Sequence, residues 1–323
     1  VYIVDYIRSA FSRAHPKKPG IDQFEEIRAD EILVQLIDKL LSEDAYQHVQ
    51  VEELAIGCAL PVKEQWNFGG RYPVMMSNLP DTCASRTLEQ QCGSGLAAIR
   101  SAAMSIASGS ADLVLAGGYE HMTRVPMGPT LFEQGILTVP EMPANKYNMS
   151  VAMNMGLTAE KLAEVSGISR KQMDEFAVSS HQKAAQAERD GFFDAERVAI
   201  ELKEGNSVIT DSCIREQTDF SALSELRSVF KEDGLISAGN SSPLTTGAGL
   251  VSLMSESLIN KTSAKPLAKI LGCVDVGVAP EIMGSSVVPA IEKLLHLHSL
   301  TVEDIDLWEI NEAFSAVPLY AIK

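Results

Sequence analysis

The sequence has little positive charge. Its 27 Lys and Arg residues are outnumbered by 43 Asp and Glu residues, which gives a formal net charge of −16 at pH 7. Nonspecific binding to nucleic acid depends on clustered Lys and Arg that neutralise phosphates. The sequence therefore argues against a nucleic-acid partner, although this balance is compatible with a local basic pocket for an anionic cofactor.

Long apolar runs and cysteine pairs are also missing. The longest apolar runs, such as residues 111–118, are far shorter than the ~20 residues of a membrane-spanning helix, and we recognise no signal peptide. The odd number of cysteines forms no CxxC pair and no metal-type spacing. We therefore expect reduced thiols, no metal centre, no transmembrane segment and a cytoplasmic location, with an organellar one left open. The cysteines are Cys58, Cys83, Cys92, Cys213 and Cys273.

What remains is the composition of a globular protein with a large core. The 323 residues are 46% hydrophobic and 22% charged, and a chain of this length is typical of about two domains. Alternating strand and helix patterns favour an α/β fold with a mostly parallel sheet. We predict strands over residues 1–7, 54–56 and 112–116, the last ended by Gly117-Gly118, and helices over 30–41 and 93–107.

The middle of the chain differs from the rest. Residues 119–234 are richer in Met, Pro and charge, with helices expected over 158–165 and 170–190. We interpret this region as an inserted domain, after which the sheet pattern returns at 234–239. The expected domains are an N-terminal half (1–118 with 235–262), the insertion (119–234) and the start of a C-terminal half (263–323).

A weak internal repeat supports a duplicated α/β architecture. The run VEELAI (51–56) resembles VEDIDL (302–307), and each follows an expected helix (30–41 and 288–298) that itself follows a strand-like run (1–7 and 267–274). The offset between the copies would place the counterpart of Cys92 beyond Lys323. On this hypothesis the second half is truncated.

Cys92 stands in the stretch EQQCGSGLAAI (89–99), between a strand-like run and a helix. Gly93 and Gly95 would allow tight backbone geometry and close approach of a ligand. The amides and dipole of the helix N-terminus would lower the thiol pKa and could bind an oxyanion. This pattern is typical of a nucleophile, although a buried structural Cys at a strand–helix junction is equally compatible with it.

Five motifs together resemble the thiolase family, in thiolase order and nearly along the whole chain. The first motif is CGSGLAAI (92–99) and the last is INEAF (310–314). Two of the motifs, in the forms GGYEHM and MNMGLTAE, are most similar to those of degradative 3-ketoacyl-CoA thiolases of fatty-acid β-oxidation. Biosynthetic acetoacetyl-CoA thiolases usually carry His where this chain has Asn154. The three motifs between are LVLAGGYEHM (113–122), MGLTAEKLA (155–163) and SAGNSSPLTTGAG (237–249).

The resemblance implies a thiolase fold and a reaction that cleaves 3-ketoacyl-CoA with CoA to give a shortened acyl-CoA and acetyl-CoA. Cys92 would be the nucleophile that carries the acyl group, and Asn311 would orient a water in an oxyanion hole. Ser242 would contact the pantetheine arm of CoA, Arg215 would lie near its adenine end, and Met155 would line the acyl pocket. The residues 119–234 would cover CoA, which acts as co-substrate without any permanent cofactor.

The resemblance also implies a homodimer or tetramer, and a hydratase/dehydrogenase subunit as a partner in some bacterial members. Two family segments, Gly-His-Pro and Cys-Gly-Gly, do not occur in this sequence, and Gln90-Gln91 stand where the family often has Asn-Arg. We expect His121 to be structural and Cys273 to lie in the core of the 267–274 strand. A gene continuing past Lys323 with both segments would indicate an active thiolase.

Three alternatives stay open. An acetoacetyl-CoA thiolase would differ in chain-length preference. A decarboxylating ketoacyl synthase shares the fold and the nucleophilic Cys, but NEAF argues for a thiolase. A non-catalytic acyl-CoA binder would account for the two absent segments if the chain is this short.

Overall fold

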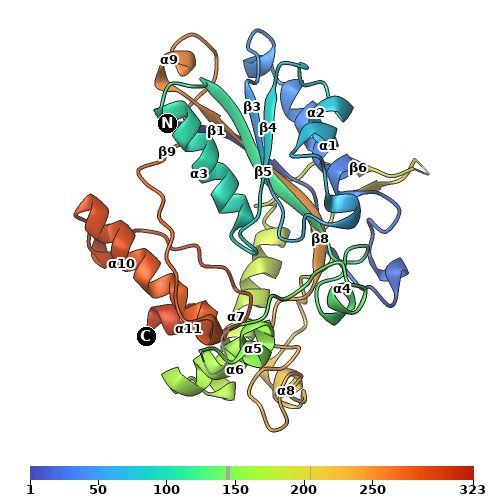
Figure 1. The fold of residues 1–323 in the computed structure, drawn as a ribbon, viewed down its shortest axis with the longest axis vertical. Coiled ribbons are helices and arrows are strands. Elements are labelled where there is room, and N and C mark those ends of the chain that lie inside the picture. The colour runs from blue at the N-terminus through green and yellow to red at the C-terminus, as the bar shows by residue number, and fades with distance from the viewer. Residues whose placement is uncertain (143–145, 204) are drawn as a thin grey trace. The chain divides into compact units, whose positions relative to one another are not determined.

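The computed structural model describes residues 1–142, 146–203 and 205–323 (Figure 1). These residues group into two compact units. Unit 1 contains residues 1–137, 192–213 and 244–270, and unit 2 contains residues 138–191, 214–243 and 271–323. The functional division expected from the sequence, with 119–234 as a cover over CoA, stays a prediction.

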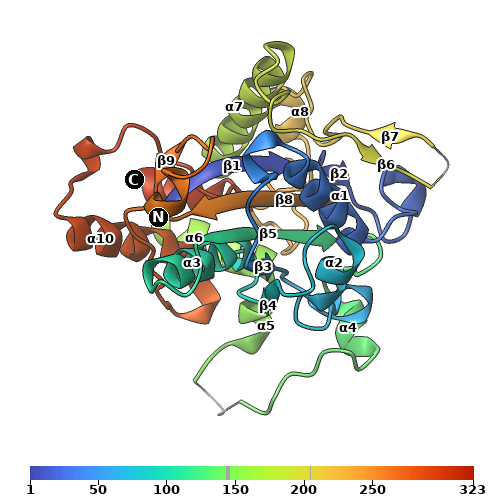
Figure 2. The same cartoon turned by 90° about the horizontal axis from the view of Figure 1, so that it is seen from above.

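Unit 1 is built on one mixed sheet with the strand order β4-β3-β5-β8-β1-β9, and β2 pairs with β8 (Figure 2). The pairs β3–β4 and β3–β5 are parallel, whereas β8 is antiparallel to both of its long neighbours, β5 and β1. The strands are β1 (Tyr2–Arg8), β2 (Ser12–Arg13), β3 (Glu53–Gly57), β4 (Ala84–Leu88), β5 (Leu113–His121), β8 (Thr245–Met254) and β9 (Ala268–Lys269), with the separate pair β6 (Ile200–Glu201) and β7 (Ser207–Val208).

The expectation of a mostly parallel sheet is therefore wrong. The last residue of β5, His121, pairs with Thr246 near the start of β8. The chain thus re-enters the sheet at the end where it left, and the two adjacent strands must run in opposite directions. The sheet pattern also does not return at 234–239, which contains no strand; it returns at β8.

Gly117 and Gly118 do not end the third strand; β5 continues through them to His121. A Cβ at Gly117 would lie 2.1 Å from the carbonyl oxygen of Gly249, and one at Gly118 would lie 2.4 Å from that of Gly57. The registers Gly57↔Gly118 and Gly118↔Gly249 place three glycines side by side across β3, β5 and β8. These glycines allow close contact between backbones and do not mark a turn.

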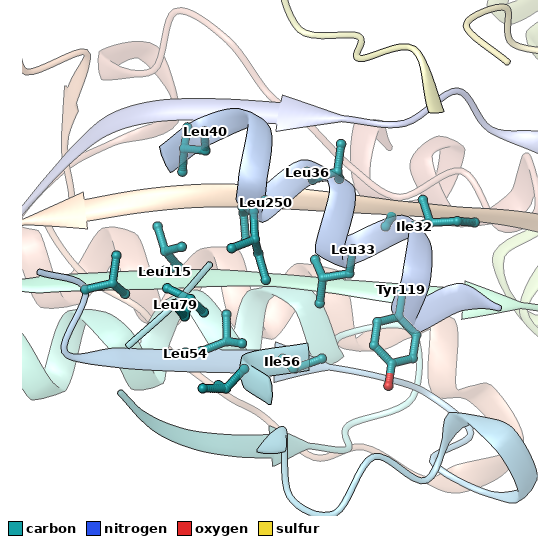
Figure 3. Packing of buried hydrophobic residues seen from close by; sticks show 14 of the residues in the cluster. Ile32, Leu33, Leu36, Leu40, Leu54, Ile56, Leu79, Leu115, Tyr119 and Leu250 are labelled. Atoms are coloured by element: carbon teal, nitrogen blue, oxygen red, sulfur yellow. The ribbon is translucent and has the colours of Figure 1, made fainter. Parts of the chain in front are cut away.

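Helices cover both faces of the sheet, as the alternation of side chains along the strands requires. On one face, α1 (Ala29–Leu41) packs its apolar side against residues such as Leu54 and Leu115 (Figure 3). On the other face, the small residues of α3 (Ser94–Ala107) pack on Ala55 and Ala116. Burial of each large aliphatic side chain contributes about 1.5–3 kcal/mol, so this two-sided core stabilises the strand ends that lead to α3.

The remaining helices are mostly where the sequence predicts them. The expected helices at 158–165, 170–190 and 288–298 form as α6 (Met155–Ser166), α7 (Arg170–Arg189) and α10 (Val287–His298). The shorter helices are α2 (Arg71–Met76), α4 (Pro129–Glu133), α5 (Met149–Ala152), α8 (Phe220–Ser224), α9 (Glu256–Ile259) and α11 (Ala316–Ile322).

The strands expected in the second copy of the repeat are mostly wrong. Only Ala268–Lys269 of the 267–274 run are in a strand, and residues 305–307 are irregular. Cys273 is consequently exposed and outside any strand, so its expected place in the core is also wrong. Helix α10 forms because its pattern is local, whereas a strand exists only where a neighbour supplies hydrogen bonds.

Candidate active site

Cys92 lies in a tight turn between β4 and α3 in unit 1. Strands β4, β3 and β5 run parallel, so the turn lies at the carboxyl edge of this part of the sheet, where open α/β sheets bind ligands. The residue is exposed, and the first helical residue of α3 comes two positions later. An exposed thiol beside a helix N-terminus is the arrangement that the sequence predicts for a nucleophile.

The strain in this turn falls on Gln91 and not on the neighbouring glycines. Gln91 has φ of +48°, in the left-handed region that a side chain of this size rarely adopts. Gly93 has an ordinary φ of −83°, and a Cβ on Gly95 would meet nothing within 4 Å. A Cβ on Gly93 would lie 3.3 Å from the Gln90 carbonyl oxygen, so Gly93 does allow a close backbone contact in this turn, whereas Gly95 does not. The approach of a ligand and the support of an oxyanion by these residues stay predictions.

Gly57, at the end of β3, lets the start of α3 approach the sheet. A Cβ at this position would lie 2.4 Å from the carbonyl carbon and oxygen of Ser94 and 2.6 Å from the amide nitrogen of Gly95. Any larger residue would push the first turn of α3 away. Gly57 thus fixes the height of Cys92 above the sheet, a role that the sequence analysis missed because it depends on a contact between distant segments.

The predicted lowering of the thiol pKa is not found. Partial burial raises the pKa of Cys92, although the residue as a whole is exposed; a hydrogen bond from its own backbone N–H opposes this, and the charge of Glu120 adds to it. This burial favours the neutral thiol over the thiolate.

Glu120, on β5, is a partly buried carboxylate that the sequence analysis did not single out. Its Oε2 accepts from the Ala59 amide at 2.8 Å, its Oε1 accepts from Gln65 Nε2 at 2.6 Å, and Cys58 Sγ lies 3.8 Å from Oε1. Burial raises the pKa of Glu120 while these hydrogen bonds lower it. A single acidic residue within the apolar LVLAGGYEHM run is a signal that could have identified this position.

His121, the next residue, has the structural role that the sequence predicts. It is fully buried. Its Nε2 lies 3.0 Å from the Phe24 carbonyl oxygen and its Nδ1 lies 3.2 Å from Thr246 Oγ1. It ties the segment before α1 to the ends of β5 and β8.

In unit 2, the structure brings together the segments of Ser242 and Asn311. The Ser242 amide donates to the Ala313 carbonyl at 2.9 Å, the Ser315 amide donates to the Asn240 carbonyl at 3.0 Å, and Ser241 forms an antiparallel bridge with Phe314. Both Ser242 and Asn311 are exposed. Asn311 does not follow a strand; it lies in an irregular segment before α11.

Helix α7 anchors the same segment. Ser180 Oγ donates to Glu312 Oε2 at 2.6 Å, one residue after Asn311. On the next residue of the helix, His181 Nδ1 accepts from the Arg215 amide at 3.3 Å. Burial lowers the pKa of His181, as does the charge of Arg215, and the charge of Glu312 opposes both.

Arg215 and Met155 also belong to unit 2. Arg215 is exposed and lines a surface hollow of about 470 Å³ together with Glu216 and Thr218. Met155 is partly buried at the first position of α6, where the Asn154 side chain caps the helix by accepting from the Leu157 amide at 3.2 Å. Asn154 thus has a structural reason to be present, because Asn is a favoured N-cap residue.

Among the residues that the structure describes, no helix is both long enough and apolar enough to cross a membrane.

Comparison with known proteins identifies the family. A family model described as "Thiolase, N-terminal domain" matches residues 1–257, and one described as "Thiolase, C-terminal domain" matches residues 264–323. The chain is 38% identical over 329 aligned positions to a 3-ketoacyl-CoA thiolase of Hahella chejuensis, with 100% of this chain and 81% of the relative covered.

Solved structures agree. The dimeric peroxisomal thiolase of Saccharomyces cerevisiae superposes with a TM-score of 0.89 at 32% identity, covering 99% of this chain and 81% of that one. An acetyl-CoA acetyltransferase of Bacillus anthracis superposes with a TM-score of 0.80 at 30% identity, covering 99% and 82%. The chain belongs to the thiolase family.

Proposed function

We propose that the protein is an acyltransferase that cleaves 3-ketoacyl-CoA with CoA through an acyl-Cys92 intermediate. The observation that carries this proposal is the exposed thiol presented between β4 and the N-terminus of α3, in a chain 38% identical to a 3-ketoacyl-CoA thiolase over its whole length.

The thiolate of Cys92 attacks the ketone carbon of the substrate. The bond between this carbon and the α-carbon then breaks, and its electron pair forms the enolate of acetyl-CoA, which takes a proton and leaves. The thiolate of a second CoA attacks the acyl-cysteine carbonyl, the bond to Sγ breaks, and the shortened acyl-CoA departs. One difficult carbon–carbon cleavage becomes two acyl transfers.

The other residues bind CoA and the acyl group and stabilise the negative charge that develops during the reaction. Asn311 orients a water toward the oxyanion, with its segment held by the Ser180–Glu312 hydrogen bond. Ser242 contacts pantetheine and Arg215 the adenine end of CoA, both from exposed positions, and Met155 lines the acyl pocket. The amides at Gly93 and Gly95 face developing negative charge. The base that takes the thiol proton is expected in the Gly-His-Pro segment, which these 323 residues do not contain.

CoA is the co-substrate, and no resident cofactor is needed for these steps. An acetoacetyl-CoA thiolase is the second candidate, favoured by the likeness to the Bacillus anthracis acetyl-CoA acetyltransferase. The capping role of Asn154 fits the degradative sequence pattern better. Activity on long and short 3-ketoacyl-CoA separates the two.

We also propose a homodimer as the smallest working assembly. Strand β4 is an edge strand of the sheet, and an exposed apolar patch of unit 1 is formed by Trp66, Phe68, Tyr72 and Met75. A second copy is the expected occupant, in line with the dimeric relative. We further propose a tetramer as an alternative assembly, a hydratase/dehydrogenase subunit as a partner, and a cytoplasmic location. Sedimentation of the purified protein tests the assembly.

Labelling with iodoacetamide at neutral pH, followed by peptide mass spectrometry, tests the nucleophile. Acyl-CoA is expected to slow the labelling of Cys92 and to leave the labelling rates of the other four cysteines unchanged. No protection of Cys92, or equal protection of all five, would contradict the proposal. Thiolysis of 3-ketoacyl-CoA by CoA, followed in the same preparation, tests the reaction itself.

A further inference from the structure

The Cys92 turn contains one buried hydroxyl that joins its two sides. Ser94 Oγ accepts a hydrogen bond from the Gln90 amide at 2.9 Å and donates one to the Gln91 carbonyl at 2.6 Å. Ser94 is only 4% exposed. The hydroxyl therefore donates one hydrogen bond and accepts another, both with the two residues that precede Cys92, in a place where water has little access.

The backbone alone closes the turn less tightly. The amides of Gly93 and Ser94 donate to the carbonyls of Gln90 and Gln91, each at 3.0 Å. Both are bonds of an ordinary turn, which does not require a left-handed residue at Gln91. The observed φ of +48° at Gln91 is costly for a residue with a Cβ, so it persists only where the surroundings impose it.

Two side chains hold Gln91: Glu89 Oε1 accepts from its amide at 3.0 Å, and Ser94 provides the buried contacts. The hydroxyl accepts from the Gln90 amide and donates to the Gln91 carbonyl, and these two groups lie on opposite sides of the N–Cα bond of Gln91, about which φ is measured. The backbone of Ser94 is in turn held against the sheet by Gly57. A rotation of Gln91 to negative φ would break the hydroxyl contacts and move the next residue, Cys92.

We propose that Ser94 is a positioning residue for the nucleophile: its hydroxyl holds Gln91 in the left-handed conformation and so fixes the direction of Cys92 Sγ. The inference rests on the proposed function for its consequence in catalysis. The geometry predicts a defect in the acyl-transfer rate and not in substrate binding, because the Ser94 side chain is buried and its hydroxyl is bonded to the backbone of the turn.

Four forms of the protein test the inference: wild type, Ser94→Ala, Ser108→Ala and the double variant Ser94→Ala with Gln91→Gly. Ser108 is the matched control because its hydroxyl also donates to a backbone carbonyl, that of Ser105, at the other end of α3. The rate of acyl transfer from acyl-CoA to Cys92 is measured in a single turnover by mass spectrometry, at several acyl-CoA concentrations and at equal folded fraction.

Ser94→Ala is expected to slow acyl transfer about 10²-fold, the scale of an ångström-sized misplacement, with the half-saturating acyl-CoA concentration unchanged within about twofold. Ser108→Ala should match wild type. The double variant should regain at least about 10-fold, because glycine adopts the left-handed conformation without a steric cost. A wild-type rate in Ser94→Ala, or no recovery in the double variant, would overturn the inference.

The rate of iodoacetamide alkylation of Cys92 distinguishes this inference from the proposed function, because it needs no substrate. If wild type accepts no acyl group, the proposed function fails. A several-fold slower alkylation in Ser94→Ala, restored in the double variant, would still support positioning by Ser94, and an unchanged alkylation rate would overturn it.

Discussion

The two units hold their functional residues in different ways. In unit 1, the helix that begins just after Cys92 contacts Gly57, which is one of three glycines side by side across β3, β5 and β8. In unit 2, Ser242, Asn311 and Arg215 are exposed and depend on hydrogen bonds to α7 and between two irregular segments. The nucleophile needs an exact direction, whereas residues that bind a long flexible ligand need access.

This difference has an energetic side. Close backbone contacts do not yield to a larger side chain, so changes in unit 1 should affect stability and rate together. Exposed residues of unit 2 contribute little to folding, so their replacement should change binding or rate alone. The following variants test the comparison, from the largest expected effect to the smallest.

Replacing the nucleophile should have the largest effect. Cys92→Ser is expected to lower acyl transfer by at least ~10³-fold, because a hydroxyl without its own base is a far weaker nucleophile than a thiolate. The measurement is the steady-state rate of thiolysis. Cys273→Ser, at another exposed cysteine, should keep the wild-type rate, and equal losses in both variants would contradict the assignment.

Gly57→Ala tests the close contact between β3 and α3. The new methyl group would lie 2.4 Å from the Ser94 backbone, and overpacking of this kind is expected to lower the free energy of unfolding by about 3 kcal/mol. Urea titration measures it. At Gly20, where a Cβ would meet only Glu25 Oε1 at 3.9 Å, alanine should change stability by less than about 0.5 kcal/mol. Similar values at both positions would show that the contact carries no constraint.

Asn311→Ala should lower kcat by about 10²-fold with little change in KM, because the water that Asn311 orients would stabilise the oxyanion mainly in the transition state. Its stability should stay near wild type, since the residue is exposed. Asn260→Ala, at an exposed asparagine that ends α9, serves as control. A rise in KM without loss of kcat would move Asn311 from the reacting carbonyl to the binding of CoA.

For Arg215→Ala we expect KM for CoA to rise about 10-fold, the effect of ~1.4 kcal/mol of lost binding, with kcat retained. The rise should shrink at high salt, because exposed charge pairs are screened. Arg227→Ala, at another exposed arginine of unit 2, should leave KM unchanged. If both variants behave alike, the hollow beside Arg215 is not the adenine site.

The smallest effect is expected at the cap of α6. Asn154→Ala removes the acceptor for the Leu157 amide and should cost about 1 kcal/mol of stability, while Asn154→Ser, which keeps a capping oxygen, should cost much less. Thermal unfolding measures both. Equal stability of the two variants would leave the choice of Asn at this position without a structural reason.

Helices could be predicted from the sequence because their signals are local. The apolar spacing in α1 and the polar pattern of α7 specify those helices without any neighbour. The strands were harder. The direction of β8 and the continuation of β5 through Gly117-Gly118 depend on pairing between distant segments. His121 and Thr246, for example, pair although they are more than 120 residues apart, and a local sequence pattern contains no information on such a pair.

The site divides in the same way. Cys92 and the NEAF segment are recognisable as motifs, since their residues are consecutive in the sequence. Ser94 lies inside a recognised motif, yet its contacts with Gln90 and Gln91 become evident only from the geometry of the turn. Gly57 and Glu120 act through the packing of separate strands, so nothing in their own sequence neighbourhoods states which partner they meet.

The thiol also has a testable pH dependence. Partial burial raises the pKa of Cys92, so the neutral thiol is favoured at pH 7 and the thiolate fraction should grow only as the pH rises past the ordinary thiol pKa. Alkylation of Cys92 should therefore still be accelerating with pH where an unperturbed thiol has levelled off.

The central claim is that Cys92 carries the acyl group, and the most direct test is to look for that group. The protein is mixed with a 3-ketoacyl-CoA, quenched in acid within the first turnover and digested, and the peptides are weighed by mass spectrometry. The account predicts one acyl adduct, on the peptide that contains Cys92, which disappears when CoA is added before the quench. An adduct on another cysteine, or an adduct that CoA does not remove, would contradict it.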